Sequence, residues 1–337
     1  MAIKKILPIL LIAVSIFGGE NTMAQNTLTA KQQSIAASAA YAALGDQQGL
    51  KKALAEGINQ GASVNELREV LVQSYAYCGF PRSLNALATL MQLAEEKSLD
   101  TSAPKSTPLD NALTTGTENQ TKLVGSEVKG KLFDFAPAID EYLKSHLFGD
   151  IFSRSDIDWQ TRELATVAML AAREGVESQL NAHIQIAKHN GLTDEQIKEV
   201  LLIASKARAE NILFGMGEKN PYGKYFIGQS YLQPINKEGV PMFNVTFEPK
   251  CRNNWHIHHK GGQILIAVSG RGWYQAWGEE ARELNPGDVV NIPPETKHWH
   301  GAAKDSWFTH VAVEIPSEGG STEWLEPVAD EEYNKLK

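Results

Sequence analysis

The sequence is poor in cysteine: Cys78 and Cys251 are its only two among 337 residues. They lie far apart, in segments of different composition, so we interpret each as a packed or free thiol rather than as half of a disulfide. The sequence also lacks a block of basic residues, and its net charge of −8 is mild for this length. These absences argue against nucleic acid or an anionic membrane as the main partner, and they favour small molecules.

The longest apolar run lies at the N-terminus. Two lysines precede the apolar segment from Ile6 to Phe17, and a polar stretch with small residues, GGENTMAQN, follows it. This order predicts a secretory signal peptide over residues 1–25, cleaved near Ala24 or Gln25, and therefore a periplasmic or secreted protein. The run is too short to span a bilayer as a helix of the mature chain. The alternative is a buried N-terminal helix.

The rest of the chain, roughly three hundred residues, is long enough for about two domains with sizeable cores. From Leu28 to Gly217 it is rich in Ala, Leu, Glu and Gln with helical spacing, whereas from about Tyr231 short apolar runs alternate with Gly and Pro. The first half predicts helices and the second an antiparallel β domain. The expected fold class is therefore multidomain α + β.

The helical half contains a repeat. The stretch GASVNELREVLVQ from Gly61 matches GLTDEQIKEVLLI from Gly191 at an offset of 130 residues, and the same offset pairs QQSIAASAAYAAL from Gln32 with RELATVAMLAARE from Arg162. Matching along a whole unit at one offset indicates duplication. Two such units predict an all-α bundle in which they bury their apolar faces on each other.

Local signals place the ends of these units. In each copy a glycine precedes a capping box, formed by Ser63 with Glu66 and by Thr193 with Gln196. We expect the first repeat over residues 28–98 and the second over 131–217. Between them, residues 99–130 are rich in Ser, Thr, Pro and Asn and predict an exposed linker. The β domain is expected over residues 231–327.

The segment that begins TRELATVAMLAAREGVESQLNAH, with YAYCGFPRSLNAL from the first copy, resembles the carboxymuconolactone decarboxylase family, whose fold is shared with the alkyl hydroperoxidase D group. The resemblance covers Leu28 to about Gly217 and implies that Glu163 and His183 lie near an active site. A histidine held by a carboxylate titrates near neutrality, as protonation of a carbanion or enolate requires. The alternative is a solvated or core-edge His183 on a helix and a Glu163 in a surface ion pair.

Two departures limit this resemblance. The hydroperoxidase branch carries a Cys-x-x-Cys pair before the histidine, but Val176 and Gln179 stand here, which excludes dithiol chemistry. In the first copy, Gln33 and Ala53 occupy the positions of the acid and the histidine. We therefore expect at most one proton-transfer site in the two repeats.

The β half carries histidines in pairs, in WHIHHKGGQ and in NPGDVVNIPPETKHWHGA. Alternate residues of a strand share a face, so His256 and His258 can point into one cavity. His298 and His300 repeat this spacing further along the chain. Two strands of a barrel would thus converge on one point, as a three-histidine metal site requires.

This half resembles the cupin family over about Met242 to Ile315. The residues that carry the resemblance are His256, His258, Gln263 and Gly270 in a first motif and Gly287, Pro293 and His298 in a second. It implies a jelly-roll β-barrel with one divalent metal ion, of Mn, Fe, Ni or Zn, held by His256, His258, Gln263 and His298. The alternative is a barrel that keeps its histidines as a polar core without metal.

The chain departs from the usual cupin pattern at three positions. Glu295 replaces a glycine, Ala302 replaces an asparagine, and Gln263 stands where the pattern has a glutamate. A neutral amide oxygen still ligates a divalent cation, but the site loses one negative charge. The metal would therefore be a stronger Lewis acid or be held less tightly.

Other side chains near the motifs have several interpretations. His300 could support a metal ligand or carry protons, whereas His259 is expected on the surface. Rings near the motifs could line a pocket for a flat or apolar substrate, and Trp273 is our candidate. Strand alternation assigns Trp255 and Trp299 to the face opposite the ligands, and hence to packing.

These features predict an exported fusion enzyme that acts on a small organic acid, lactone or aromatic-derived compound and forms a homo-oligomer. Glu163 and His183 would transfer protons in a decarboxylase- or lyase-like helical domain, and the cupin metal would act in a second site. One alternative is a cupin-only dioxygenase or isomerase with a structural helical domain. Another is a non-catalytic periplasmic ligand-binding module.

Overall fold

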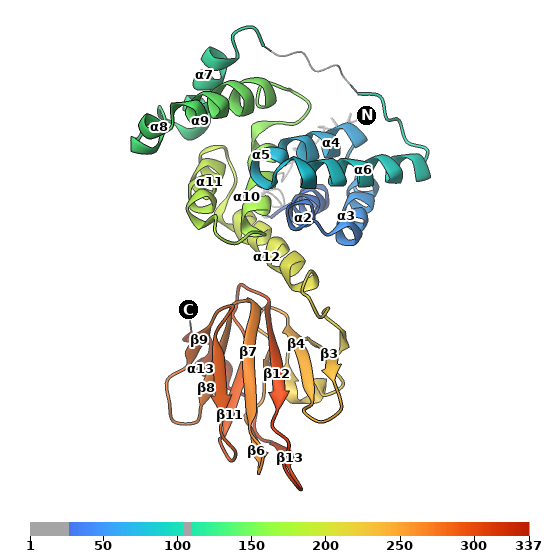
Figure 1. Ribbon diagram of the computed structural model, residues 1–337, viewed down its shortest axis with the longest axis vertical. Coiled ribbons are helices and arrows are strands. Elements are labelled where there is room, and N and C mark those ends of the chain that lie inside the picture. Colours follow the sequence, from blue (N-terminus) through green and yellow to red (C-terminus); the bar gives the residue numbers. More distant parts are fainter. Residues whose placement is uncertain (1–26, 104–108, 337) are drawn as a thin grey trace, which may run out of the picture.

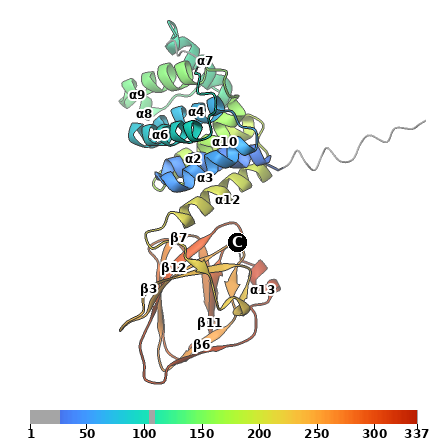
Figure 2. The same ribbon diagram turned by 90° about the vertical axis from the view of Figure 1, so that its right-hand side faces the viewer.

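The computed structural model describes residues 27–103 and 109–336. The predicted signal peptide over residues 1–25 lies outside the described residues. The described chain forms a helical domain followed by a β domain, one above the other in Figure 1. The long helix α12 (Asp194–Glu210) leads from the first domain toward the second, as both views show (Figures 1 and 2). The expected multidomain α + β fold class is confirmed.

The helices of the two sequence repeats correspond to each other. In the first copy they are α2 (Ala30–Leu44), α3 (Gln47–Asn59) and α4 (Val64–Gln73), and in the second copy α10 (Trp159–Ala171), α11 (Glu177–His189) and α12. The helices α3 and α11 keep the sequence offset of the repeat at both ends. The helices α4 and α12 begin at the same offset, because each starts with its predicted capping box.

Glycines turn the chain before these two helices. Gly61 and Gly191 have φ angles of +85° and +96°, in a region that side chains with a Cβ atom disfavour. Buried residues of α2 and α10 then share one hydrophobic core, in which alanines such as Ala39 and Ala168 are fully buried. The first copy continues through α5 (Tyr75–Cys78) and α6 (Phe80–Glu96), which have no counterpart in the second.

The structure differs from the predicted linker over residues 99–130. Within it lies α7 (Ala112–Val124), which packs on the π-helical segment η1 (Leu143–Ile151). The approach is close, since a Cβ atom on Gly116 would come 1.6 Å from the Lys144 carbonyl oxygen. Tertiary contact of this kind overrides the weak helix propensity of a Thr-rich segment. The short helices α8 (Lys131–Phe135) and α9 (Pro137–Tyr142) follow α7.

The β domain contains two antiparallel sheets. The strands of the first, in spatial order, are β1 (Glu218–Lys219), β3 (Ser230–Asn236), β4 (Met242–Phe247), β12 (Phe308–Glu314), β7 (Gln263–Gly270) and β10 (Val289–Ile292). Those of the second are β13 (Ser321–Trp324), β6 (His256–His259), β11 (His298–Ala302), β5 (Arg252–Asn253) and β2 (Phe226–Ile227), with β8 (Gly272–Ala276) beside β11 and β9 (Arg282–Leu284) beside β8. A short helical turn, η2 (Gly223–Tyr225), precedes β2, and the helix α13 (Asp330–Asn334) follows the last strand.

Hydrogen bonds connect the two domains. The hydroxyl of Ser205 on α12 accepts the main-chain N–H of Trp307 at 3.0 Å and lies 3.3 Å from the hydroxyl of Ser306. Both partners lie just before β12. The start of that strand is therefore fixed against the helical domain.

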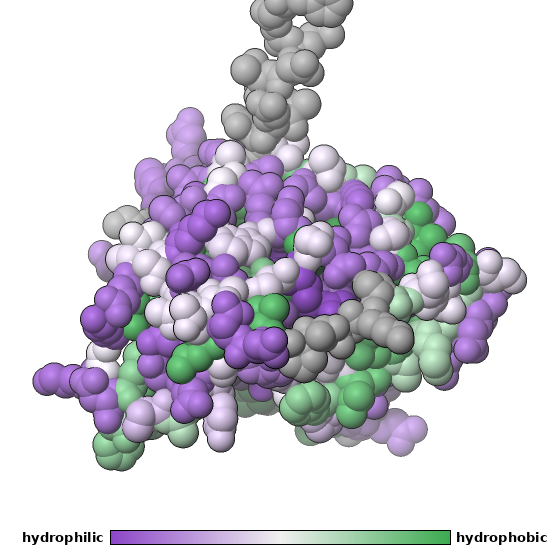
Figure 3. All heavy atoms as spheres, turned by 90° about the horizontal axis from the view of Figure 1, so that it is seen from above, coloured by the Kyte–Doolittle hydropathy of each residue, from purple (hydrophilic) through white to green (hydrophobic). Residues whose placement is uncertain are grey.

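The cysteines agree with the sequence prediction, since Cys78 is half-buried, Cys251 is buried, and both are free thiols. Seen from the helical end, the surface is mainly hydrophilic, with separate hydrophobic patches (Figure 3). No helix within residues 27–103 and 109–336 combines the length and the apolar character that crossing a membrane requires.

Candidate functional sites

Strand pairing brings the two histidine motifs together. On β6, His256 and His258 are buried while the residue between them is half-buried, so both point inward. On the neighbouring strand β11, His298 lies directly opposite His256. One ring nitrogen from each of the three histidines lies within 4.8 Å of the others. The predicted convergence of these histidines is therefore present.

The outer nitrogens of these rings are held by hydrogen bonds. His256 Nδ1 donates to the Asn254 carbonyl at 3.0 Å, and His298 Nδ1 donates to the Thr296 carbonyl at 2.8 Å. His258 Nδ1 lies 3.2 Å from the Thr322 hydroxyl. A donating Nδ1 fixes the tautomer and leaves the lone pair of Nε2 free, which is how metal-binding histidines are usually oriented.

Buried atoms without a partner mark the centre of the site. Nε2 of His258, Nε2 of His298 and Oε1 of Gln263 accept no hydrogen bond from any described residue. Leaving buried polar atoms unpaired is costly. Three imidazoles and an amide oxygen form a donor set suited to a divalent transition-metal ion. The residues therefore fit the predicted metal.

A carboxylate outside this donor set orients the unusual glutamine. Gln263 Nε2 donates to Glu314 Oε1 at 2.6 Å, a bond that an ionised glutamate at position 263 could not donate. The amide oxygen is left without a hydrogen bond, in the lining of the cavity that His256 and His258 also line. Glu314 Oε2 also lies 3.7 Å from His258 Nδ1. The cupin pattern has a carboxylate at position 263. Here that position holds a neutral amide, and the carboxylate of Glu314 lies next to it.

Burial keeps these imidazoles neutral. It lowers the pKa of His298 to about 4 and that of His256 well below the ordinary value. The pKa of His258 is also lowered, mainly by burial. Neutral imidazole is the form that binds a metal ion.

A cavity of about 500 Å³ opens beside the histidines. Its apolar lining includes Phe226, Leu232, Phe243 and Val245. Trp324 also lines it and stacks on His256, with ring centroids 4.8 Å apart. A cavity of this size, apolar with a few polar groups, suits a small organic molecule.

Two further histidines face this cavity. His300 is held by Asn253, whose Nδ2 donates to His300 Nε2 at 3.0 Å and whose Oδ1 accepts the His300 main-chain N–H at 2.9 Å. His310, on β12, has no hydrogen-bond partner for either ring nitrogen among the residues described. Burial lowers the pKa of His310 to about 4, so it is a neutral group with a free lone pair.

The tryptophans separate by face. Trp255, Trp299 and Trp273 pack together with Tyr333 of α13, which agrees with the prediction for the first two. Trp273 was predicted beside the substrate but does not lie there. It pairs with Gly301 on β11 and therefore lies on the same face of the sheet as Trp299, opposite to the histidines. The tryptophan that lines the cavity is Trp324.

His259 lies at the surface, as expected, between Glu295 and Glu323 at 2.6 and 2.8 Å. Its hydrogen bonds to these two carboxylates raise the pKa of His259. Glu295 has a φ of +63°, which explains why the cupin pattern has a glycine there. Its side chain also accepts the main-chain N–H of Lys260.

The helical domain holds the second candidate site. His183 Nδ1, on α11, donates to Glu163 Oε2, on α10, at 2.8 Å. Glu163 is fully buried and the His183 side chain is 14% exposed, so neither belongs to a surface ion pair. The other oxygen of Glu163 has no hydrogen-bond partner within the described chain. This is the imidazole–carboxylate pair that proton transfer requires.

The first repeat completes this site with Tyr77. Its ring packs edge-on against His183, with centroids 5.5 Å apart, and its buried hydroxyl has no partner in the described parts of the chain. Burial and the charge of Glu163 raise the pKa of Tyr77. In the first copy the corresponding position of the histidine is the buried Ala53, so the described repeats form one such pair.

Sequence reasoning missed Tyr77 and His310, and among the tryptophans it chose Trp273 rather than Trp324. A signal existed for His310, which alternates with Phe308 and Ala312 in WFTHVAVE and so shares the inner face of a strand. No local pattern distinguishes Tyr77 from its neighbours. Its role depends on the packing of one repeat on the other.

Comparison with known families agrees with this geometry. The profile of the carboxymuconolactone decarboxylase family matches residues 16–91 and 137–210. That of the cupin domain matches residues 243–313. The chain belongs to the carboxymuconolactone decarboxylase family and carries a C-terminal cupin domain. The two matched segments of the decarboxylase family correspond to the two repeats.

Three curated relatives show the range of activities among similar proteins. The chain is 40% identical to an (R)-mandelonitrile lyase of Granulicella tundricola over 115 residues, which is 33% of this chain and 87% of the relative. It is 30% identical to a 4-carboxymuconolactone decarboxylase of Acinetobacter baylyi, over 27% of this chain and 69% of the relative. It is 25% identical to an acireductone dioxygenase of Bacillus mycoides, over 42% of this chain and 76% of the relative.

Proposed function

We propose that the cupin domain of this carboxymuconolactone decarboxylase family member is a metal-dependent carbon–carbon lyase for small aromatic 2-hydroxynitriles. The observation that carries the proposal is the convergence of three imidazoles on one point beside an apolar cavity, which Gln263, with its unpaired amide oxygen, also lines. The similarity to a mandelonitrile lyase supports it, since the 115 aligned residues are close in number to the residues of the β domain.

His256, His258, Gln263 and His298 would hold the ion. A divalent ion there supplies a Lewis acid that stabilises negative charge on a substrate oxygen. The aromatic ring of the substrate is expected to lie against Trp324 and Phe226, which line the same cavity.

His310 would move the proton. As a neutral imidazole without a partner among the described residues, it is free to accept the proton of the substrate hydroxyl. The bond between the hydroxyl-bearing carbon and the nitrile carbon then breaks. Its electron pair leaves with cyanide, a carbonyl forms, and cyanide takes up the proton. The products are an aldehyde and hydrogen cyanide.

The first test is elemental analysis together with cleavage of mandelonitrile. We expect about one equivalent of Mn, Fe, Ni or Zn in the wild type, and loss of both metal and activity in the His256→Ala/His298→Ala double variant. His310→Ala should keep the metal and lose activity by about 10²–10⁴-fold. His259→Ala, at the surface, is the matched control. A metal-loaded wild type without cleavage would refute the lyase activity.

We also propose that Glu163 and His183 catalyse proton transfer on a small organic acid or lactone in the helical domain. The 2.8 Å pair between α10 and α11 supports this, as does similarity to a carboxymuconolactone decarboxylase. His183→Gln and Glu163→Gln should abolish decarboxylation of a muconolactone while mandelonitrile cleavage continues. If both variants keep full activity on every substrate turned over, the helical domain is structural.

Similarity to an acireductone dioxygenase favours one competing function, a cupin-only dioxygenase. Oxygen uptake with an enediol substrate distinguishes it from the lyase, which consumes no dioxygen. If the wild type consumes dioxygen and the His256→Ala/His298→Ala double variant does not, the cupin is a dioxygenase and the lyase proposal is wrong.

We further propose that the protein is exported. The supporting feature is the sequence of residues 1–25. N-terminal sequencing of protein recovered from the periplasm should give a chain that begins near Gln25 or Asn26, and full-length protein confined to the cytoplasm would contradict export.

A further inference from the structure

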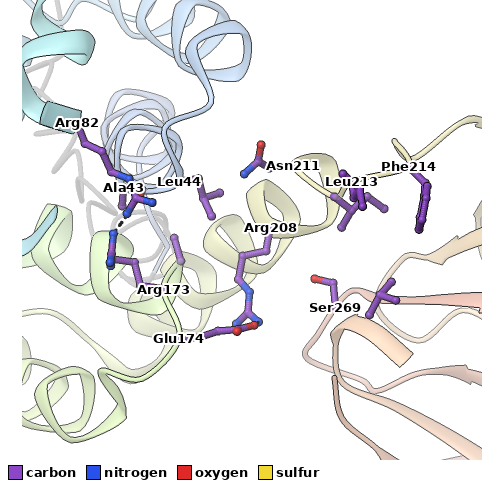
Figure 4. Close-up of a pocket in the computed structure, with 13 residues that line it drawn as sticks. Ala43, Leu44, Arg82, Arg173, Glu174, Arg208, Asn211, Leu213, Phe214 and Ser269 are labelled. Carbon is purple, nitrogen blue, oxygen red and sulfur yellow. Dashed lines mark hydrogen bonds and ion pairs between the residues drawn. The ribbon is translucent and has the colours of Figure 1, made fainter. Parts of the chain in front are cut away.

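A second cavity, of about 510 Å³, lies where the helical domain meets the β domain (Figure 4). Its lining comes from the end of α2, from α6, from the turn after α10, from α12 and the segment that follows it, and from β7. It shares no lining residue with the cupin cavity. Its volume suits a small organic molecule.

The lining of this junction cavity is strongly basic. Arg82, Arg173 and Arg208 contribute three guanidinium groups, and the one carboxylate, Glu174, pairs with Arg208 at 2.9 Å. Neither Arg82 nor Arg173 forms an ion pair with a described residue. Two positive charges in the lining are therefore uncompensated.

These two arginines converge on the C-terminal end of α2. Arg173 Nη1 reaches the Ala43 carbonyl at a long distance of 3.4 Å. Arg82 Nε would lie 3.7 Å from a Cβ atom built on Gly45. Figure 4 shows the two guanidinium groups pointing toward each other beside Ala43.

Arg173 has unused hydrogen-bonding capacity. Its Nε is buried and has no acceptor in the part of the chain that the structure describes. An unpaired buried donor is costly, and for a charged group more so. A ligand that brings oxygen atoms to this place would supply the missing acceptors.

The other side of the junction cavity is apolar. Leu44, Leu213, Phe214 and Val268 line it. Leu213 is 91% exposed and Phe214 is 42% exposed, although both are large hydrophobic side chains. This exposed apolar surface lies in the same cavity as the guanidinium groups of Arg82 and Arg173. The combination matches a ligand with an acidic head and an apolar body.

We propose that the junction cavity binds a small organic carboxylate, with the carboxylate on Arg82 and Arg173 and the apolar body against Leu213 and Phe214. Guanidinium groups bind carboxylates in a two-point geometry that a single ammonium group cannot match. Val268 and Ser269 belong to β7, so the bound acid contacts both domains. This inference is independent of the lyase reaction.

The competing explanation is that the two arginines only cap the carbonyl groups at the end of α2. Capping predicts that Arg82→Gln and Arg173→Gln lower the melting temperature. It predicts no effect of any added acid. The two explanations thus differ in a measurable way.

The test is isothermal titration of the metal-loaded full chain with benzoate and with acetate. We expect benzoate to bind, with its Kd raised on the order of tenfold by Arg82→Gln and by Arg173→Gln. Phe214→Ala should weaken benzoate binding and leave acetate binding unchanged. Arg282→Gln, which removes an exposed arginine of the β domain paired with Asp288, is the matched control and should bind benzoate as the wild type does.

Benzoate could also bind a metal ion in the cupin, so the titration is repeated with the His256→Ala/His298→Ala double variant. Unchanged benzoate binding there places it at the junction cavity. Absence of binding at millimolar benzoate, or binding unchanged by both arginine variants, would overturn the proposal. Tighter binding of inorganic phosphate that is independent of Phe214 would overturn the assignment to an organic acid.

Discussion

At the scale of single residues, Gln263 differs from the cupin pattern in one group, an amide in place of a carboxylate. The structure gives the reason that this change is tolerated, because Glu314 accepts its Nε2–H at 2.6 Å and supplies the negative charge from just outside the donor set. The site therefore has two polar groups whose chemistry depends on each other. Changing only one of the two, Gln263 or Glu314, should destabilise the protein.

We predict that Gln263→Glu destabilises the metal-free protein by about 1.5–3 kcal/mol, because a hydrogen bond to a charged group becomes a contact between two carboxylates. Added divalent metal should restore most of the stability, since the ion neutralises the new charge. Thermal unfolding with and without a chelator measures both effects. Gln263→Leu, which adds no charge, is the control, and equal melting temperatures of Gln263→Glu and wild type in chelator would contradict the prediction.

The hydroxyl of Tyr77 permits a second test. It is buried without a partner among the described residues, so Tyr77→Phe should raise the free energy of unfolding by about 1 kcal/mol while slowing proton transfer at His183. Tyr333→Phe is the matched control, because that hydroxyl donates to the Ala302 carbonyl at 2.6 Å and its loss should destabilise by about 1 kcal/mol. Denaturant unfolding compares the two, and a destabilised Tyr77→Phe would show that the hydroxyl has a partner.

At the scale of secondary structure, the strands β11 and β12 carry His298 and His310, whose pKa values burial lowers to about 4. Below about pH 6.5 these histidines bind protons in the unfolded chain but stay neutral in the folded chain. The free energy of unfolding therefore falls as the pH falls from about 6.5 to about 4, and then levels off. Each histidine contributes about 3 kcal/mol to this loss. Unfolding of the metal-free β domain, followed in the full chain by tryptophan fluorescence across this range, should show it. A flat profile in the wild type would refute neutral burial.

The elements also show what sequence reasoning reached. The repeated helices were predictable because glycine turns and capping boxes are local signals, and Ser63 and Thr193 cap the helices expected of them. The metal motifs were predictable because two-residue spacing fixes the face of a strand. The helix α7 was not, since its close contact at Gly116 forms with η1, which comes later in the chain. Trp273 was misplaced because its face depends on strand pairing.

At the scale of the whole molecule, oligomerisation stays a prediction. Apolar side chains of α8 and α9 are exposed, with Leu132 at 67% and Phe135 at 87%, and exposed apolar patches often mark interfaces. We expect the wild type to be a homo-oligomer by light scattering and Phe135→Asp to shift toward smaller species. Leu213→Asp, an exposed leucine of the domain junction, is the control. A monomeric wild type would contradict the prediction.

The position of Tyr77 has a consequence for how the two copies evolved. The first repeat lacks the acid and the histidine, and its Tyr77 packs against the pair in the second, so the proposed site draws on both copies. Duplication usually frees one copy to change, but a site shared between two copies would restrict both. We therefore expect the two halves to vary together, with a change in the shape of one matched by a change in the other.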